Sequence, residues 1–361
     1  MDPAAVVNRR LWTQRLAGGP FASPAAAVET LGAVQAQEFP QAIWALAQRC
    51  GHPAADEVIR AFDAGELLRT HVLRPTWHFV RPDDIRWMLR LTAPRIRVAM
   101  RQGMRVHDLD DALIARSGGL VAAALEERGP LTRFELREEL ARSGIEGSAQ
   151  RIAHISGHLE LTELICSGPV RDGKQTYDLL DRRAPAGRGI EGDEALAELA
   201  ARYFFSHGPA SLADFAWWSG LKMGDARRGL ELSRDRFEEV GELDGDTYFA
   251  NPAANAAAPP EGALLLGSFD ELTVAYRRLR TVSVNGEPGR TLPLGPILLD
   301  GRWVGSWRRI RGKAPAIRAS LFRSLDAPGE AGLEAECRRL AAHLGIPAQL
   351  ELAEGEPLAA A

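Results

Sequence analysis

The stretch GPLTRFEL at residues 129–136 has a second copy in the chain, GPASLADF at residues 208–215. Both copies fit the pattern GPx[ST]xx[DE][LF]. In the first copy Thr132 is followed three residues later by Glu135. This is the spacing of a capping box, in which the hydroxyl accepts from amides of a new helix and the carboxylate reaches back to the chain before it. The pattern therefore predicts that a helix begins at the same point of two repeated units.

The sequence around the two copies repeats one order of elements. In each copy a helical segment precedes the Gly-Pro turn, a short helix follows it, and a third helical segment comes after a glycine. Two strand-like runs then flank an Asp-Gly pair, at residues 172–173 and 244–245. Asp-Gly between such runs is a strong hairpin signal. Helix, helix, helix, hairpin is the order of a winged helix, so the repeat predicts tandem winged helices over residues 113–190 and 191–252.

The N-terminal segment, residues 1–112, is interpreted as a third and more divergent copy. VVNRRLWTQRLAG is a helix candidate, Ser23-Pro24 opens a second helix, and THVLRPTWHFV alternates like a wing strand. No clear capping box is present. We expect a winged-helix-like domain here as well.

The C-terminal part has a different composition. NPAANAAAPPEG reads as an Ala/Pro-rich linker, and short strand-like runs follow it: ALLLGSF, RTVSV, ILLDG and RWVGSWRRI. VNGEPG and LLDGRW are hairpin signals. The helical segment EAGLEAECRRLAAHLG comes after them. Residues 258–361 are therefore predicted to form a β-rich, barrel-like domain with a C-terminal helix, and the fold class is predicted to be α+β.

Composition excludes several classes of protein. The chain has 361 residues, of which 45% are hydrophobic and 25% charged, as in a globular protein of several domains. No apolar run approaches the roughly 20 residues that span a bilayer, and the N-terminus lacks the apolar segment of a secretory signal. We therefore expect a cytoplasmic protein without a membrane partner. The cysteines Cys50, Cys166 and Cys337 are too far apart for a CxxC metal site, and their odd number argues against a disulfide framework.

Positive charge in this chain is carried mainly by arginine. Only three basic residues are lysine, and the formal net charge is -4. Arginine suits phosphate, although codon bias explains its excess equally well. One cluster contains Arg86 and Arg90, and WRRIRGK contains another. The third helix of the first repeat carries Gln150, Arg151, His154 and His158. Such runs are either solvated faces or parts of a DNA-binding surface, and both interpretations are open at this point.

Two glutamines stand out in the segment SPAAAVETLGAVQAQE. Apolar residues up to Val34 are expected to form the inward face of a helix. Side chains two residues apart on a helix point about 200° apart, so Gln35 and Gln37 can serve one site only if the backbone is extended or turning. Pro40 supports this because it disfavours helix at Phe39. The pair is either two surface amides at a helix exit or two polar groups converging on a cavity.

Five segments, in order along nearly the whole chain, resemble the AlkZ/YcaQ family of bacterial DNA glycosylases. These are QAQEFPQAIWAL, RTHVLRPTWHFVRPDDI, GPASLADFAWWSGL, LLLGSFDELTVAYRRLR and ILLDGRWVGSWRR. The resemblance implies three tandem winged helices and a C-terminal β-barrel in a C-shaped, DNA-binding molecule. The family's catalytic motif is Gln-x-Gln in the AlkZ-like branch and Gln-x-Asp in the YcaQ-like branch. It falls here on Gln35 and Gln37, which implies the AlkZ-like branch and a catalytic role for both residues.

Further positions are expected to contact DNA, from the family match or from the arginine clusters. They are Arg74, His78, Arg81, Arg86, Arg90, Asp270, Arg277, Arg308, Arg309 and Arg311. For His78 the alternative is a structural role on its strand. For Asp270 the alternative is an ion pair within the protein.

The chemistry of an amide limits the substrate. An amide cannot take a proton from water as a carboxylate can, so two glutamines can only position water and stabilise charge. This suffices for an N7-alkylated purine, which is positively charged and leaves as a neutral base. We expect a monofunctional DNA glycosylase acting on N7-alkylated purines in double-stranded DNA, with interstrand crosslinks among its possible substrates. It would need no metal, cofactor or obligate protein partner, and would associate with the nucleoid. The alternative is a non-enzymatic winged-helix DNA-binding protein or transcriptional regulator.

Overall fold

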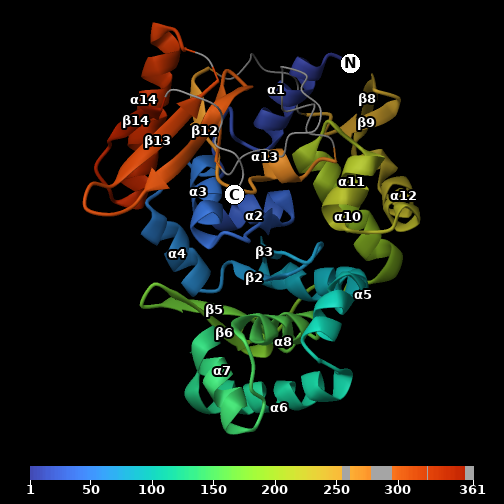
Figure 1. Ribbon diagram of the computed structural model, residues 1–361. Coiled ribbons are helices and arrows are strands. Elements are labelled where there is room, and N and C mark those ends of the chain that lie inside the picture. Colours follow the sequence, from blue (N-terminus) through green and yellow to red (C-terminus); the bar gives the residue numbers. More distant parts are fainter. Residues whose placement is uncertain (254–260, 278–294, 323, 354–361) are drawn as a thin grey trace.

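The computed structural model describes residues 1–253, 261–277, 295–322 and 324–353. Three units share one order of elements: a helix, a two-residue strand, two helices and a β-hairpin. In each unit the three strands form one sheet, with the last strand in the middle. The first and third units lie with the C-terminal sheet in the upper part of Figure 1, and the second unit lies below them.

The bounds of the elements are as follows. The first unit contains α2 (Pro24–Leu31), β1 (Val34–Gln35), α3 (Phe39–Arg49), α4 (Ala55–Asp63), β2 (Leu68–His71) and β3 (Trp77–Val80). The second unit contains α6 (Asp111–Arg128), β4 (Leu131–Thr132), α7 (Arg133–Arg142), α8 (Ala149–Leu161), β5 (Ile165–Arg171) and β6 (Lys174–Leu179). The third unit contains α10 (Gly192–His207), β7 (Ala210–Ser211), α11 (Leu212–Ser219), α12 (Met223–Leu232), β8 (Glu238–Leu243) and β9 (Asp246–Ala250). The remaining elements before the C-terminal part are α1 (Pro3–Thr13), α5 (Pro82–Val106), α9 (Leu180–Arg183) and the 3₁₀ helix η1 (Arg234–Arg236).

Both predicted capping boxes are confirmed. The Thr132 hydroxyl accepts from the backbone amide of Glu135 at 3.2 Å, and the Glu135 carboxylate accepts from the Thr132 amide at 2.7 Å. That amide is the main reason why the pKa of Glu135 is lowered to about 2. Ser211 and Asp214 make the same reciprocal bonds at the start of α11. Helices α7 and α11 therefore begin where the repeat places them.

The predicted Asp-Gly hairpins are also confirmed. Each pair joins two antiparallel strands and has a positive φ at both residues, with 50–52° at aspartate and 70–81° at glycine. A type I′ turn requires this backbone, and Asp-Gly adopts it readily. The three pairs are Asp172–Gly173, Asp244–Gly245 and Asp300–Gly301. The predicted RTVSV strand and VNGEPG turn lie outside the described residues.

The C-terminal part is an open sheet. Its described elements are β10 (Ala263–Leu265), α13 (Glu271–Val274), β11 (Pro296–Leu299), β12 (Arg302–Ile310), β13 (Ala316–Leu321), α14 (Ala327–Leu344) and β14 (Leu350–Ala353). The strands follow the order β10-β11-β12-β13-β14. No pairing joins β10 to β14 among the described residues, so the predicted barrel is wrong for this part of the chain. Apolar residues of α3 and α14 share a buried cluster with one face of the sheet. These helices bury that face, so the sheet does not have to close into a barrel to bury it.

The apolar core is continuous between the units. One buried cluster includes Leu68 of the first unit, Leu161 of the second and Phe204 of the third, together with Tyr276. Helix α5 crosses between the units and packs on α8, where a Cβ at Gly103 would lie 2.0 Å from the His154 ring. His158 on the same helix is buried. Because α5 covers this face of α8, His154 and His158 are not presented to a DNA groove.

Candidate active site

The Gln-x-Gln segment occupies the place that the capping residue has in the other two units. Gln35 pairs with His78 of the central strand, as Thr132 and Ser211 pair with the central strands of their own sheets. In those units a helix begins at the next residue. In the first unit residues 36–38 intervene before α3, and its N-cap residue makes no side-chain capping bond. The motif therefore begins at the position that the capping residue has in the other two units, and three residues separate that position from the next helix.

The chain has left the helix at the pair, as its spacing predicted. Helix α2 ends at Leu31, Gln35 lies in β1, and the Ala36 amide donates to the Trp77 carbonyl at 2.7 Å, continuing the β1–β3 pairing. Gln37 follows in a bend, where it is half-buried, whereas Gln35 and Ala36 are buried.

Two details of the prediction are wrong. Val34 belongs to β1 and not to the preceding helix, which ends three residues earlier. Phe39 begins α3, with Pro40 in its first turn. Proline is tolerated in the first turn because an amide there has no intrahelical partner.

Both glutamine side chains are oriented by donors on their oxygen atoms. Gln35 Oε1 accepts from Arg74 Nη2 at 2.7 Å, and Gln37 Oε1 accepts from the Trp77 backbone amide at 3.3 Å. A guanidinium and an amide N–H only donate, so the oxygen of each glutamine must face them. Neither Nε2 has a hydrogen-bond partner within the described ranges. Both NH₂ groups are therefore left to donate to a bound molecule.

A buried carboxylate holds the backbone of Gln35. Glu271 Oε1 accepts from the Gln35 amide at 2.6 Å, and its other oxygen accepts from Trp218 Nε1 at 2.9 Å. Burial alone would raise the pKa of Glu271, but His207, whose Nε2 lies 3.4 Å from Glu271 Oε2, and the nearby charge of Arg74 lower it to about 2. Glu271 is thus ionised at neutral pH and ties α13 to the glutamine segment.

Arg69 and Trp77 support the other end of the pair. Arg69 Nε donates to the Ala36 carbonyl at 2.9 Å, and its guanidinium lies 4.4 Å from the centroid of the Trp77 ring. Burial lowers the pKa of Arg69 to about 10, so it remains charged. Trp77 Nε1 donates to Glu160 of α8 at 3.1 Å. Arg69, Glu160 and Glu271 were missed by sequence reasoning, because their partners are distant in the chain and no short motif marks them.

Three residues predicted to contact DNA are used inside the protein. Arg74 is half-buried and also donates to the Val274 carbonyl at 3.1 Å. His78 is fully buried, where burial and then the charge of Arg74 lower its pKa to about 3. Asp270 is buried and accepts two bonds from Arg49, at 2.7 and 2.8 Å. The structure therefore favours the structural alternatives for His78 and Asp270, and corrects their placement on a DNA-facing surface.

The other predicted arginines divide into two groups. Arg86 and Arg90 form salt bridges with Glu163, at 3.3 and 2.9 Å. Arg81 donates to the Glu66 carbonyl. The second group is exposed and forms no salt bridge with another described residue: Arg277, Arg308, Arg309 and Arg311. Arg90 is also exposed, so these four are the exposed predicted positions that have no salt bridge to another described residue.

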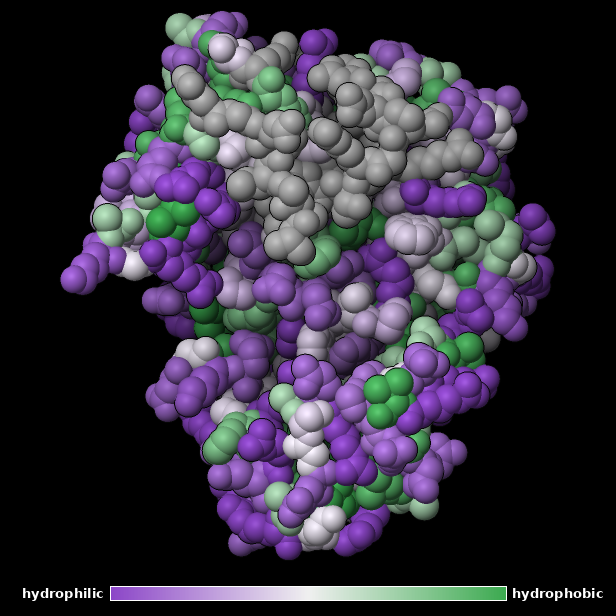
Figure 2. All heavy atoms as spheres, viewed as in Figure 1, coloured by the Kyte–Doolittle hydropathy of each residue, from purple (hydrophilic) through white to green (hydrophobic). Residues whose placement is uncertain are grey.

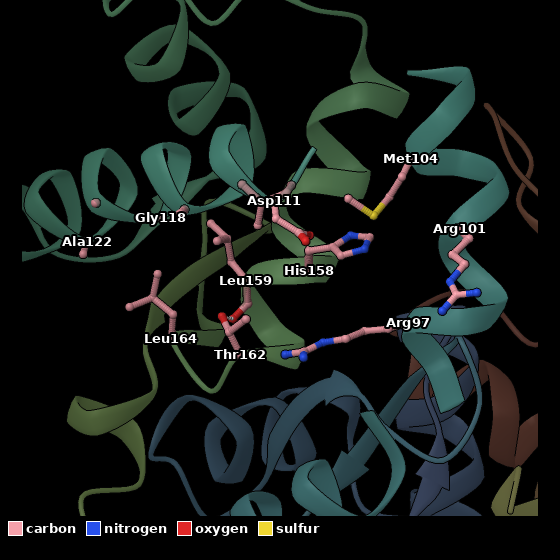
Figure 3. Close-up of a pocket in the computed structure, with 13 residues that line it drawn as sticks. Arg97, Arg101, Met104, Asp111, Gly118, Ala122, His158, Leu159, Thr162 and Leu164 are labelled. Carbon is pink, nitrogen blue, oxygen red and sulfur yellow. Dashed lines mark hydrogen bonds between the residues drawn. The ribbon is translucent and has the colours of Figure 1, made fainter. Parts of the chain in front are cut away.

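A pocket of about 730 Å³ lies away from the glutamines, between α5, α6 and α8. In Figure 3 Arg97 of α5 extends toward Thr162 at the end of α8, and Gly118 and Ala122 of α6 lie on the opposite side of His158 from Arg101. Neither glutamine lines it. We place the site at the glutamines because oriented polar groups converge there. No group of three His, Cys, Asp or Glu residues suited to a metal ion occurs in the described part of the chain. None of its helices is long and apolar enough to cross a membrane.

Three comparisons identify similar proteins. The sequence matches the family "DNA glycosylase AlkZ-like" over residues 28–343. It is 27% identical over 307 residues to an "Interstrand DNA cross-link repair glycosylase" of Streptomyces sahachiroi, covering 78% of this chain and 80% of the relative. The solved structure of Streptomyces sahachiroi DNA glycosylase AlkZ has the same fold, with a TM-score of 0.77, 23% identity, and coverage of 98% of this chain and 99% of that one. Because the family match spans most of the sequence, the chain belongs to the AlkZ-like family of DNA glycosylases.

Proposed function

We propose that the protein is a monofunctional DNA glycosylase that hydrolyses the N-glycosidic bond of N7-alkylated purines in double-stranded DNA, with interstrand crosslinks among its substrates. The observation that carries the proposal is the glutamine pair at the end of β1, in which each side-chain oxygen accepts from a fixed donor of the β2–β3 hairpin. The crosslink-repair glycosylase to which the chain is similar supports the choice of substrate.

The pair is suited to a base that is already poised to leave. In our mechanism the C1′–N9 bond breaks and its electrons neutralise the purine cation. A water molecule that accepts from the NH₂ group of one glutamine and donates to the Oε1 of the other then bonds to C1′ through its remaining lone pair, and its proton passes to solvent. The second lone pair of that Oε1 can accept from the water. No step needs a side chain that takes up a proton, which agrees with the use of amides.

The accessibility of the second glutamine suits bulky lesions. Gln35 is only 6% exposed, whereas Gln37 is half-buried and Glu38 beside it is exposed. A base attached to a large adduct or to the opposite strand cannot enter a closed pocket. An open site at the end of a short strand accepts such a lesion more easily.

We further propose that the three units are winged helices that, with the C-terminal part, form a C-shaped DNA-binding molecule. The corresponding domains are residues 1–112, 113–190, 191–252 and 258–361. The repeated strand order supports this proposal. Figure 2 shows mainly hydrophilic residues on the visible face of the second unit, with only small hydrophobic patches. The exposed Arg277, Arg308, Arg309 and Arg311 are the proposed phosphate contacts.

The test is excision of N7-methylguanine from a duplex, detected as an alkali-labile abasic site. We expect Gln35→Ala combined with Gln37→Ala to lower the single-turnover rate at least about 100-fold, a loss of about 3 kcal/mol of transition-state stabilisation. Gln102→Ala, on an exposed position of α5, is the matched control. Undiminished excision by the double variant would refute the assignment. Binding of lesion DNA by the wild type without any abasic product would favour a non-enzymatic DNA-binding protein.

A duplex with an N7-linked interstrand crosslink tests the wider substrate range. Unhooking separates the strands on a denaturing gel after release of one linked base. We expect the same double variant to lose this activity too. Excision of N7-methylguanine without unhooking would restrict the function to single-strand lesions.

A further inference from the structure

Trp217 is the described tryptophan with the most exposed side chain. Its exposed fraction is 52%, whereas Trp44, Trp87 and Trp218 are almost fully buried. It lies on α11, next to the buried Trp218. Half of this indole is therefore available to a molecule outside the chain, and burial of its apolar surface would stabilise such a contact.

The position of Trp217 is fixed by the elements of the glutamine site. Its Nε1 donates to the Val274 carbonyl at 3.1 Å. The same carbonyl accepts from Arg74 Nη1 at 3.1 Å, and Arg74 Nη2 donates to Gln35 Oε1 at 2.7 Å. One carbonyl and one guanidinium therefore connect the indole to the first glutamine.

The packing beneath Trp217 is tight. Gly220, which ends α11, approaches the β2–β3 turn so closely that a Cβ would lie 2.2 Å from the Leu73 carbonyl oxygen and 3.7 Å from Arg74 Cγ. This contact leaves little freedom for α11 to move relative to the turn that carries Arg74. The indole is thus held at its edge, and its exposed surface lies beside the candidate site.

The ring faces of Trp217 also differ from those of other tryptophans. Arginine guanidinium groups lie over the rings of Trp12, Trp77 and Trp87, at 5.6, 4.4 and 5.9 Å from the ring centroid. Within the described residues, no cation and no second aromatic ring lies on Trp217. Its electron-rich face is therefore open to a cation from outside the chain.

We propose that the face of Trp217 binds the positively charged purine ring of an N7-alkylated lesion by a cation–π contact. The inference rests on the proposed function, and it names the group that selects charged bases over ordinary ones. An unmodified purine is neutral and gains only stacking from this contact. Selection by charge adds to the requirement for a good leaving group, since the same alkylation produces both properties.

Two duplexes that differ in lesion charge provide the test. One contains 2′-fluoro-N7-methylguanosine, which is cationic and resists hydrolysis. The other contains 7-methyl-7-deazaguanosine, which has a similar shape but no charge. We expect the wild type to bind the cationic duplex more tightly, and Trp217→Leu to lower that preference between about 2-fold and 30-fold, the range of one cation–π contact. An unchanged preference would overturn the proposal.

Two further variants separate the ring's electrons from its shape. Site-specific fluorination of Trp217 withdraws charge from the ring face while the indole keeps nearly the same size. We expect the preference for the cationic duplex to decrease stepwise with each added fluorine, and Trp217→Phe to retain part of it. A preference that does not respond to fluorination would show that the ring acts by shape alone, and would refute the cation–π contact.

The matched control is Phe205→Leu, which removes an aromatic side chain of 46% exposure from α10. It should leave the preference unchanged. Equal melting temperatures of the variants exclude loss of folding as the cause of a changed preference. Wild-type excision of N7-methylguanine is measured alongside. If the wild type excises and the Trp217 variants keep the charge preference, only this inference fails; if the wild type does not excise, the proposed function fails.

Discussion

Substitution of Arg74 tests whether this residue orients Gln35 or contacts a DNA phosphate. Sequence analysis placed Arg74 on a DNA phosphate, whereas the structure shows it holding Gln35 Oε1 at 2.7 Å and the Val274 carbonyl at 3.1 Å. Burial lowers the pKa of Arg74 and the nearby Glu271 opposes this effect. If Arg74 positions Gln35, removal of its guanidinium should lower the excision rate. If it contacts a phosphate, removal should weaken DNA binding.

The magnitude follows from the bond to Gln35. A hydrogen bond with one charged partner contributes about 1.5–3 kcal/mol. If about 2 kcal/mol of this orients the amide in the transition state, Arg74→Met should lower the single-turnover excision rate about 30-fold. Binding of duplex DNA should change little. Arg74→Lys should recover part of the rate, because an ammonium can reach one of the two oxygens but not hold both in fixed geometry.

The assay combines single-turnover excision with the salt dependence of binding. A lost phosphate contact weakens binding and lowers the slope of log affinity against log salt by about 1. Arg277→Met is the comparison for a lost phosphate contact, since that side chain is exposed and is a proposed phosphate contact; it should lower the slope and leave the excision rate at saturating enzyme unchanged. Reduced salt dependence with an unchanged excision rate in Arg74→Met would refute the positioning role.

Three further predictions concern stability and can be checked by urea denaturation. Asp270→Leu should destabilise the fold by about 3–5 kcal/mol, because it leaves the buried Arg49 unpaired, and adding Arg49→Met should restore much of the loss. The pKa of His78 is lowered to about 3 in the folded protein, so as the pH falls below about 6.5 the unfolded chain takes up this proton before the folded chain does. The free energy of unfolding should therefore fall by about 2 kcal/mol between pH 6.5 and 5, and His78→Gln should remove that part of the pH dependence. Gly220→Ala should destabilise the fold by more than about 2 kcal/mol, because it adds a steric clash with the β2–β3 turn to the cost of a positive φ. Gly245 also has a positive φ but no neighbour within 4 Å, so Gly245→Ala should destabilise the fold by only about 1–2 kcal/mol.

The fold also explains why the C-terminal sheet does not need to close. Trp44 of α3 donates from Nε1 to the Leu265 carbonyl at 2.6 Å, joining the first unit to the edge strand β10. A parallel strand, β14, follows the long helix α14 and forms the other edge. An edge covered by a neighbouring unit is protected from further pairing, as closure would protect it.

Local chemistry determined the elements that the sequence predicted well. The capping boxes at Thr132 and Ser211 and the three Asp-Gly turns depend on residues within four positions of one another, so their bonds and backbone angles follow from the sequence alone. The exit from the helix at Gln35 and Gln37 was predicted for the same reason, and the structure places Gln35 in a strand and Gln37 in a bend. Two side chains two residues apart can share a face only on an extended or turning chain.

Only the tertiary structure decided which groups surround the glutamines. Glu271 is 236 residues from Gln35 in sequence, and the carbonyl shared by Arg74 and Trp217 is 200 residues from Arg74 and 57 from Trp217. Nothing local distinguishes Arg74 on a phosphate from Arg74 on an amide, or an exposed Trp217 from the buried Trp218 beside it. Those assignments depend on how α11, α13 and the β2–β3 turn pack together. Local chemistry therefore specified the glutamine motif and its backbone, whereas long-range packing specified how its amides point and which ring lies beside them.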